Sequence, residues 1–235
     1  MPLPFHLDFP PNKTIELSRA LVDDQPVALP LEVPLDCSRL PQRSDMARRI
    51  FQEASECLML CAHVVNLAHG AESILDPQIN PISRWTSLDA KLGLWYRNRS
   101  QEFKPMVDLE SNDDLFPTIL FTNSAGLLGN QMYHTAMLLL LQSKPRTVKP
   151  AGGRKSWPMS PLRHAHRICG IAMGNNCRES WDPSLLASFV VASKGMTHET
   201  QHEAILTRLD KISQLTGWSA SVTRYQLLLR EAWGI

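Results

Sequence analysis

Apolar residues recur at three- and four-residue steps along most of the chain, which is the period of an α-helix. The first such run lies between Ser44, a residue type that caps helix N-termini, and Gly70, a residue type common just after helix C-termini. A second run follows Asn80 and Pro81, which suit the cap and the first position of a helix. The expected apolar faces are Ile50, Ala54, Cys57, Cys61, Val64 and Ala68 in the first helix and Trp85, Leu88, Leu92 and Trp95 in the second.

The segment 112–142 carries apolar residues around most of the helical circumference, so we expect one central, buried helix there. Pro117 would fall in its first turn, where proline is tolerated. Gly126 and Gly129 lower the helix propensity and predict a kink or a close crossing with another helix. The same period predicts further helices over 162–176, 183–193, 197–217 and 219–233.

The first 43 residues have a different character, because eight of the 17 prolines lie before residue 42. Proline fixes φ and has no amide hydrogen, so we expect residues 1–43 to form an irregular arm. Part of this arm is apolar enough to pack along a core, at Leu29, Leu31, Val33 and Leu35. With no convincing alternating β pattern, the sequence predicts an all-α fold: an irregular helical bundle over 44–235 with a proline-rich N-terminal arm over 1–43.

Composition favours an intracellular globular protein. The hydrophobic fraction is 43%, and the net charge of +1 gives no electrostatic reason to expect a nucleic-acid or membrane partner. The N-terminus "MPLPFHLDFPPNK" lacks the apolar helix of a signal peptide, and the run 136–141 is too short to cross a bilayer. Five cysteines at irregular spacing indicate a reducing compartment rather than a disulfide framework.

The stretch "LRHAHRICGIAMGNN" over 162–176 gathers residues that could form a metal or catalytic site. His164 and His166 would lie roughly 200° apart on a helix, so they are not expected to bind one metal ion. Cys169 belongs to the apolar face, whereas Arg163, His166, Arg167 and Gly170 would face away from it. We therefore expect a packing helix, and we likewise expect Cys57 and Cys61 to be buried core residues.

Other candidate chemistry is sparse. His198, Glu199 and His202 match the HExxH pattern of zinc hydrolases, but His198 would start its helix and no third ligand is evident. Asp113 and Asp114 are expected to stabilise a helix N-terminus, and the basic loop over 143–161 is expected to be solvated. No catalytic residue, metal site or cofactor is predicted, so the chain is not expected to be an enzyme.

Four blocks, taken in order, resemble the fungal-specific transcription factor domain, the helical regulatory region of Zn(II)2Cys6 regulators, and especially its ARCA-like group. They are "LGLWYRNRSQEFKPM", "LFPTILFTNSAGLLGNQMYHTAMLLLLQSKP", "HAHRICGIAMGNN" and "MTHETQHEAILTRLDKISQLTGWSASVTRYQLLLREAW". The resemblance covers the greater part of the chain, from Trp85 to Trp233.

The resemblance implies an α-helical, usually nuclear domain that modulates transcription, sometimes in response to a small molecule, and it carries over no catalytic residues. Its expected partners are the transcription machinery or a homologous regulator, with a homodimer and a small-molecule effector as further options. The family's zinc cluster needs six closely spaced cysteines, and this chain has five scattered ones without a CxxC pair. That departure argues against direct DNA binding and fits a truncated regulator, an incomplete gene model or one part of a split protein.

The main hypothesis is thus a regulatory domain, expected in the nucleus and also in the cytoplasm. Two alternatives to it remain. The first is a helical interaction protein, such as a dimer-forming inhibitor of a full-length regulator. The second, less favoured, is a zinc hydrolase that uses the "HETQH" motif.

Overall fold

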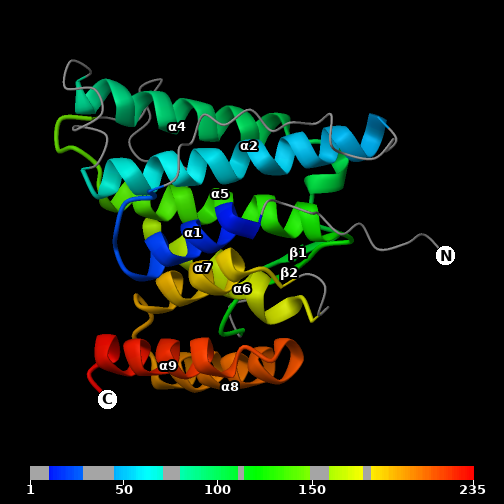
Figure 1. The fold of residues 1–235 in the computed structure, drawn as a ribbon, viewed down its shortest axis with the longest axis vertical. Helices are drawn as coiled ribbons and strands as arrows, with labels where there is room; N and C mark the ends of the chain where they lie inside the picture. The colour runs from blue at the N-terminus through cyan, green and yellow to red at the C-terminus, as the bar shows by residue number, and fades with distance from the viewer. Residues whose placement is uncertain (1–10, 29–44, 71–79, 111–113, 149–158, 177–180) are drawn as a thin grey trace.

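The structure is a computed structural model of the 235-residue chain, and it describes residues 11–28, 45–70, 80–110, 114–148, 159–176 and 181–235. The described part is mostly helical, which confirms the all-α class (Figure 1). Its helices are α1 Pro11–Val22, α2 Asp45–Ala68, α4 Pro81–Asn98, α5 Ser124–Gln142, α6 Pro161–Gly174, α7 Pro183–Ser193, α8 Glu199–Thr216 and α9 Ser219–Trp233. A short 3-10 turn, η2 Gln101–Phe103, and two strands, β1 Val107–Leu109 and β2 Thr118–Leu120, lie between α4 and α5.

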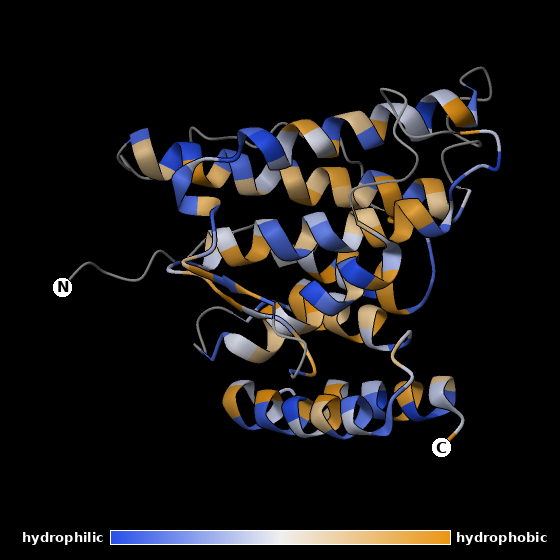
Figure 2. Ribbon diagram, turned by 180° about the vertical axis from the view of Figure 1, so that it is seen from behind, coloured by the Kyte–Doolittle hydropathy of each residue, from blue (hydrophilic) through white to orange (hydrophobic). Residues whose placement is uncertain are grey.

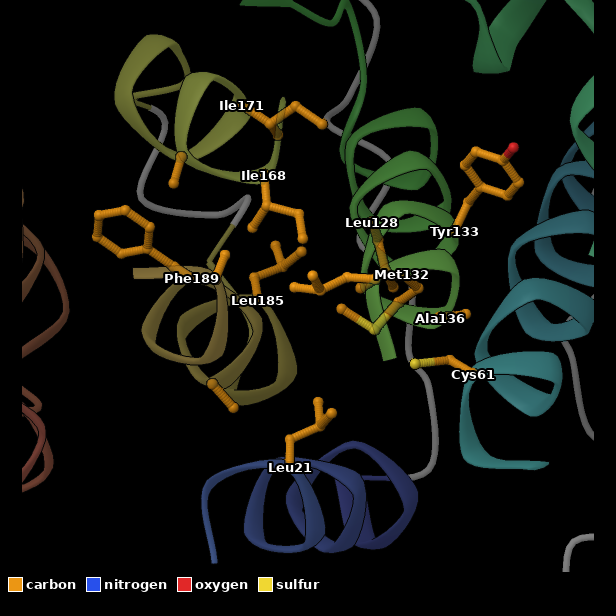
Figure 3. Packing of buried hydrophobic residues seen from close by; sticks show 14 of the residues in the cluster. Leu21, Cys61, Leu128, Met132, Tyr133, Ala136, Ile168, Ile171, Leu185 and Phe189 are labelled. Atoms are coloured by element: carbon orange, nitrogen blue, oxygen red, sulfur yellow. The ribbon is translucent and has the colours of Figure 1, made fainter. Parts of the chain in front are cut away.

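Helix α5 is the centre of the fold, with α2 and α4 on one side and α1, α6 and α7 on the other (Figure 1). Every residue from Ala125 to Leu138 is buried, as expected for a helix that is apolar on most sides. Figure 3 shows side chains of α1, α2, α6 and α7 converging on Leu128, Met132 and Ala136 of α5. The predicted central helix therefore exists, although it begins later than expected.

Helices α8 and α9 form a separate pair at one end of the molecule (Figure 1). Each of these helices buries one face and exposes a polar one, so hydrophobic and hydrophilic residues alternate along both ribbons (Figure 2). Gly217 ends α8 in a left-handed conformation, with φ of 80°, as its residue type predicts. None of the described helices has both the length and the hydropathy that a membrane span requires.

The N-terminal arm was predicted to be irregular, and this is wrong for residues 11–22, which form α1. The prolines stand at the beginning of this segment and beyond its end, so they limit the helix without interrupting it. Leu17 and Leu21 are buried, and α1 packs on α7. The apolar positions 29, 31, 33 and 35 lie outside the described residues.

The segment 112–123 was predicted to begin the central helix, and this too is wrong for its described part. Helix α5 begins at Ser124, and the Asn123 side chain caps it by accepting a hydrogen bond of 2.7 Å from the Gly126 amide. Upstream, β2 pairs antiparallel with β1, so that Val107 faces Leu120 and Leu109 faces Thr118. Pro117 has no amide hydrogen for a helix and disfavours helical geometry in the residue before it, which leaves this stretch free to pair as a strand.

The two glycines of α5 mark a close approach, as predicted: Gly129 faces Trp95 of α4 as well as the η2 turn, and Gly126 faces η2. A Cβ atom at Gly129 would lie 2.8 Å from the Phe103 ring, and one at Gly126 would lie 2.6 Å from the Glu102 carbonyl oxygen. Only glycine lets the turn before β1 lie this close to the central helix. Because η2 precedes β1 in the chain, this contact with α5 also helps to position the start of the hairpin.

Candidate functional site

A cleft of about 670 Å³ opens between the start of α6, the β1–β2 hairpin and the start of α8. The hairpin contributes Glu110, Asp114, Leu115, Phe116 and Pro117. Helix α6 contributes Leu162, Arg163, His166 and Arg167, and the start of α8 contributes His198, Thr200 and Gln201. Apolar, cationic and hydrogen-bonding side chains therefore meet in one open concavity, which is typical of a small-molecule site.

The start of α6 is set by Ser160 and Pro161. The Ser160 hydroxyl oxygen accepts a hydrogen bond of 3.2 Å from the Arg163 amide, and Pro161 occupies the first helical turn. This start places His164 and His166 on different faces, as predicted from the helical period. His164 is buried toward α5, whereas His166 is half-buried on the cleft with its ring 5.7 Å from that of Phe116.

Arg167 was predicted to face away from the core, and this is wrong, because it is only 6% exposed. Its guanidinium donates two hydrogen bonds to the Asp108 carboxylate, with N–O distances of 2.9 and 2.6 Å. Burial lowers the pKa of Arg167, but the hydrogen bonds and charge of Asp108 outweigh it, so the pKa is raised. The hairpin, which the sequence pattern did not reveal, is what covers this side of α6.

Gly170 was also expected to face away, and it is buried against the hairpin. A Cβ atom there would overlap the Pro117 carbonyl, and one at Gly174 would lie 2.8 Å from a Leu120 methyl carbon. The missing side chains let β2 lie directly on α6. This contact holds Asp108 and Glu110 beside the α6 arginines.

Behind Arg167, His134 of α5 and His164 of α6 form a buried pair with their Nδ1 atoms 2.8 Å apart. The Arg167 Nε–H donates to His134 Nε2 at 3.2 Å, so Nε2 carries no proton. A neutral His134 must then carry its proton on Nδ1 and donate it to Nδ1 of His164. Burial lowers the pKa of both histidines, helped by Arg167, and that of His164 falls to about 4.

The three residues of the HETQH motif, His198, Glu199 and His202, have different environments. His198 is exposed at the N-cap of α8 and lines the cleft, and Glu199 is exposed beside it. His202 instead stacks on Trp233 at 3.9 Å, and its Nε2 lies 2.8 Å from the Met196 carbonyl oxygen. Within the described ranges, no three His, Cys, Asp or Glu side chains lie close enough to hold a metal ion.

The cysteines that the structure describes are core residues, as predicted. Cys57, Cys61 and Cys169 are free and buried, and burial raises the pKa of Cys61 and Cys169 to about 12. The Cys57 thiol donates to the Gly129 carbonyl oxygen at 3.1 Å. Cys37 and Cys177 lie outside the described residues.

Two remaining predictions concern charged residues. Asp114 does not stabilise a helix start, because α5 begins ten positions later; it is exposed at the cleft, and Asp113 lies outside the described residues. In the basic loop, Lys144 is half-buried and Arg146 is exposed, while Lys149, Arg154 and Lys155 fall outside the described ranges.

Sequence reasoning missed Asp108, Glu110 and His134, and it placed Arg167 wrongly. The one local signal was His134, a lone histidine inside the apolar run of α5. A buried polar residue in such a helix needs a partner, and that partner comes from α6.

The fold and the cleft together define an all-α protein with an open polar-apolar cleft at the junction of two helices and a hairpin. No family model matches the chain, and neither a curated protein nor a solved structure matches it.

Proposed function

We propose that this chain is a transcription regulatory domain of the fungal type, without a DNA-binding zinc cluster of its own, that acts through protein contacts or by binding a small molecule. The ordered set of sequence blocks carries the proposal. These blocks fall on the end of α4, on β2 and α5, on α6, and on the α8–α9 pair, so they include the central helix and most of the elements that line the cleft. Blocks that coincide with packing elements support a shared helical framework better than blocks in loops would.

The cleft supports the ligand-sensing form of this proposal. Its lining combines apolar side chains with paired charges, and its volume of about 670 Å³ suits a small molecule. The reactive groups nearby favour recognition over catalysis: His134 and His164 hydrogen bond to each other, and burial raises the pKa of the Cys169 thiol. The domain would then bind a ligand in the cleft, and this binding would change its contact with a protein partner.

A reporter assay tests the proposal. Residues 1–235 are fused to a heterologous DNA-binding module, and expression of a reporter under that module's operator is compared with the module alone. We expect a several-fold change in reporter expression, and no change for an equally abundant Leu128→Asp fusion, because a buried carboxylate in α5 should disrupt the core. Equal expression with the intact fusion and the module alone would contradict the proposal.

A binding assay with DNA tests its other half. Purified residues 1–235 are titrated with short duplexes at physiological salt. We expect weak binding without sequence preference, since the net charge is only +1. Tight, sequence-specific binding would overturn the version in which the chain depends on another protein for DNA contact.

A helical interaction protein is the second candidate, and the outer edge of β1 favours it. Met106 and Leu109 are 65% and 63% exposed at this strand, and β1 is the edge of a two-stranded sheet in the described part of the chain. An exposed apolar edge strand is a surface on which chains associate. Sedimentation velocity would detect a dimer, and a Leu109→Lys variant should dissociate it.

A further inference from the structure

Glu110 occupies the cleft as a carboxylate between two arginines. Its Oε2 lies 2.6 Å from an Arg163 guanidinium nitrogen, and its Oε1 lies 3.4 Å from Arg167. Arg167 is already satisfied by Asp108 and His134, so Arg163 depends on Glu110 more than Arg167 does. The Glu110 side chain is 45% exposed and that of Arg163 is 52% exposed, so this pair can open toward solvent at little cost.

The cleft also exposes apolar surface beside this ion pair. Leu115 and Leu162 line it and are 43% and 53% exposed, and the ring of Phe116 in the hairpin faces that of His166. Exposed leucines on both walls of one concavity favour a ligand whose apolar body would cover them. The cationic and apolar features therefore lie within the same site.

We propose that the cleft binds a small molecule with one carboxylate on an apolar or aromatic body, and that Glu110 is the resident competitor for its carboxylate position beside Arg163. Binding exchanges one carboxylate for another. Arg163 therefore keeps a negative partner, and Glu110 moves into solvent instead of being left unpaired in the interior. A neutral or cationic ligand has no carboxylate to take the place of Glu110 beside Arg163, so it would leave this ion pair intact.

The exchange also gives the site a way to report occupancy. Glu110 directly follows β1, and Asp108 within β1 holds Arg167 and, through it, the His134–His164 pair. Release of Glu110 would loosen the end of β1 while Asp108 keeps the hairpin on α6. This reporting step rests on the proposed regulatory function, whereas the binding step does not.

The test uses 4-phenylbutyrate and its neutral amide, 4-phenylbutanamide, titrated calorimetrically into the purified chain. The variants are Glu110→Gln, Arg163→Met and the pair combined, with Glu231→Gln on the exposed end of α9 as the matched control. We expect the acid to bind with one-to-one stoichiometry. Glu110→Gln should tighten it about threefold and Arg163→Met should weaken it about threefold, the scale of an exposed ion pair. The amide should respond to neither change, and Glu231→Gln should match the wild type.

Three results would overturn the site: no saturable binding of the acid to wild type or Glu110→Gln, equal binding of acid and amide, or weaker acid binding in Glu110→Gln. Far-ultraviolet circular dichroism of each variant confirms that the fold persists, which is expected because both side chains are exposed. An inactive reporter fusion together with the expected acid binding would contradict the regulatory function and support the binding site. An active fusion without acid binding would contradict the binding site and support the regulatory function.

Discussion

At the scale of single residues, Arg167 joins three parts of the molecule. Its guanidinium bridges Asp108 of the hairpin and His134 of the central helix, and its own helix is α6. A planar guanidinium can serve both partners at once, which a lysine ammonium cannot do with the same geometry. Arg167 therefore determines which tautomer His134 adopts and where the hairpin lies.

Replacing Arg167 by Met should destabilise the protein by about 2 kcal/mol, because His134 Nε2 loses its donor inside the core. The cost stays below that of a fully buried ion pair, since the Asp108 side chain is 37% exposed and can be hydrated. Urea unfolding measures the change. Arg163→Met, one turn earlier and exposed, is the matched control and should cost less than about 1 kcal/mol. Equal losses in the two variants would contradict a special role for Arg167.

The histidine pair predicts a pH dependence of stability. Burial and Arg167 lower the pKa of both histidines in the folded state, from 6.5 to about 4 for His164, so the unfolded chain binds more protons in that interval. Stability should therefore be complete above pH 6.5 and decline as the pH falls toward 4. Urea unfolding at pH 7, 6 and 5 measures the slope.

A His134→Gln variant is the control for this slope, because glutamine is neutral throughout and can accept from Arg167. Its stability should fall less steeply between pH 7 and 5 than that of the wild type. The buried Asp182 carboxyl, whose pKa is raised by burial, contributes with the opposite sign at the acidic end of the range and is unchanged in the variant. Parallel slopes in the two proteins would show that the pair does not titrate as described.

At the scale of elements, the packing of the hairpin on α6 depends on Gly170 and Gly174, and Gly170 has the tighter contact. Gly170→Ala should destabilise the protein by about 1–3 kcal/mol, because the new methyl group would overlap the Pro117 carbonyl. Gly195→Ala is the control, since its nearest neighbour would lie 3.8 Å away, and it should be neutral or slightly stabilising. Thermal unfolding compares the two, and a harmless Gly170→Ala would mean that β2 does not lie on α6 as described.

The helices were largely predictable from sequence because each buries one face at the helical period, and the caps at Asn80 and Gly217 marked their ends. The strands were not, because each has three residues and exists only through its partner. Helix α1 was missed because proline content describes a segment as a whole, whereas the positions of the prolines decide whether a helix fits between them. Sequence patterns therefore predicted most of the elements whose hydrogen bonds join near neighbours in the chain, and they missed the strands, whose hydrogen bonds join distant residues.

The site was predictable only in part for the same reason. Helical geometry correctly separated His164 from His166 and placed Cys169 in the core. The carboxylates that meet the α6 arginines come from more than 50 positions away in the chain, at Asp108 and Glu110. Nothing in the sequence around 108–110 indicates that pairing, since it depends on where the Pro117 region lies against Gly170.

At the scale of the whole molecule, the α8–α9 pair is joined to the rest through a few specific contacts. The Arg208 guanidinium of α8 is buried and donates to the carbonyl oxygens of Ala172 and Asn175 at the end of α6, at 2.7 and 2.8 Å. A cation at a helix C-terminus is favourable because the unpaired carbonyls there carry partial negative charge. Trp233 adds a hydrogen bond of 3.0 Å to the Ser193 carbonyl oxygen.

Loss of the Arg208 contact should let the pair undock without unfolding the centre. In Arg208→Met, amide hydrogens of α8 and α9 should exchange faster while those of α5 keep their protection, because local opening draws on the weakest contacts. Arg230→Met, exposed near the end of α9, is the control and should leave exchange unchanged. Faster exchange throughout the chain would instead show that the two parts open together.

The packing of α1 on α7 has a consequence for synthesis of the chain. The apolar face of α1, with Leu17 and Leu21, leaves the ribosome before α7, the helix on which it mainly packs, and α7 follows only after the chain has grown from Val22 to beyond Pro183. At roughly 5–20 residues per second this interval lasts on the order of ten to thirty seconds. During that time chaperones can bind the apolar face of α1, and a nascent chain stalled before α7 would leave that face exposed.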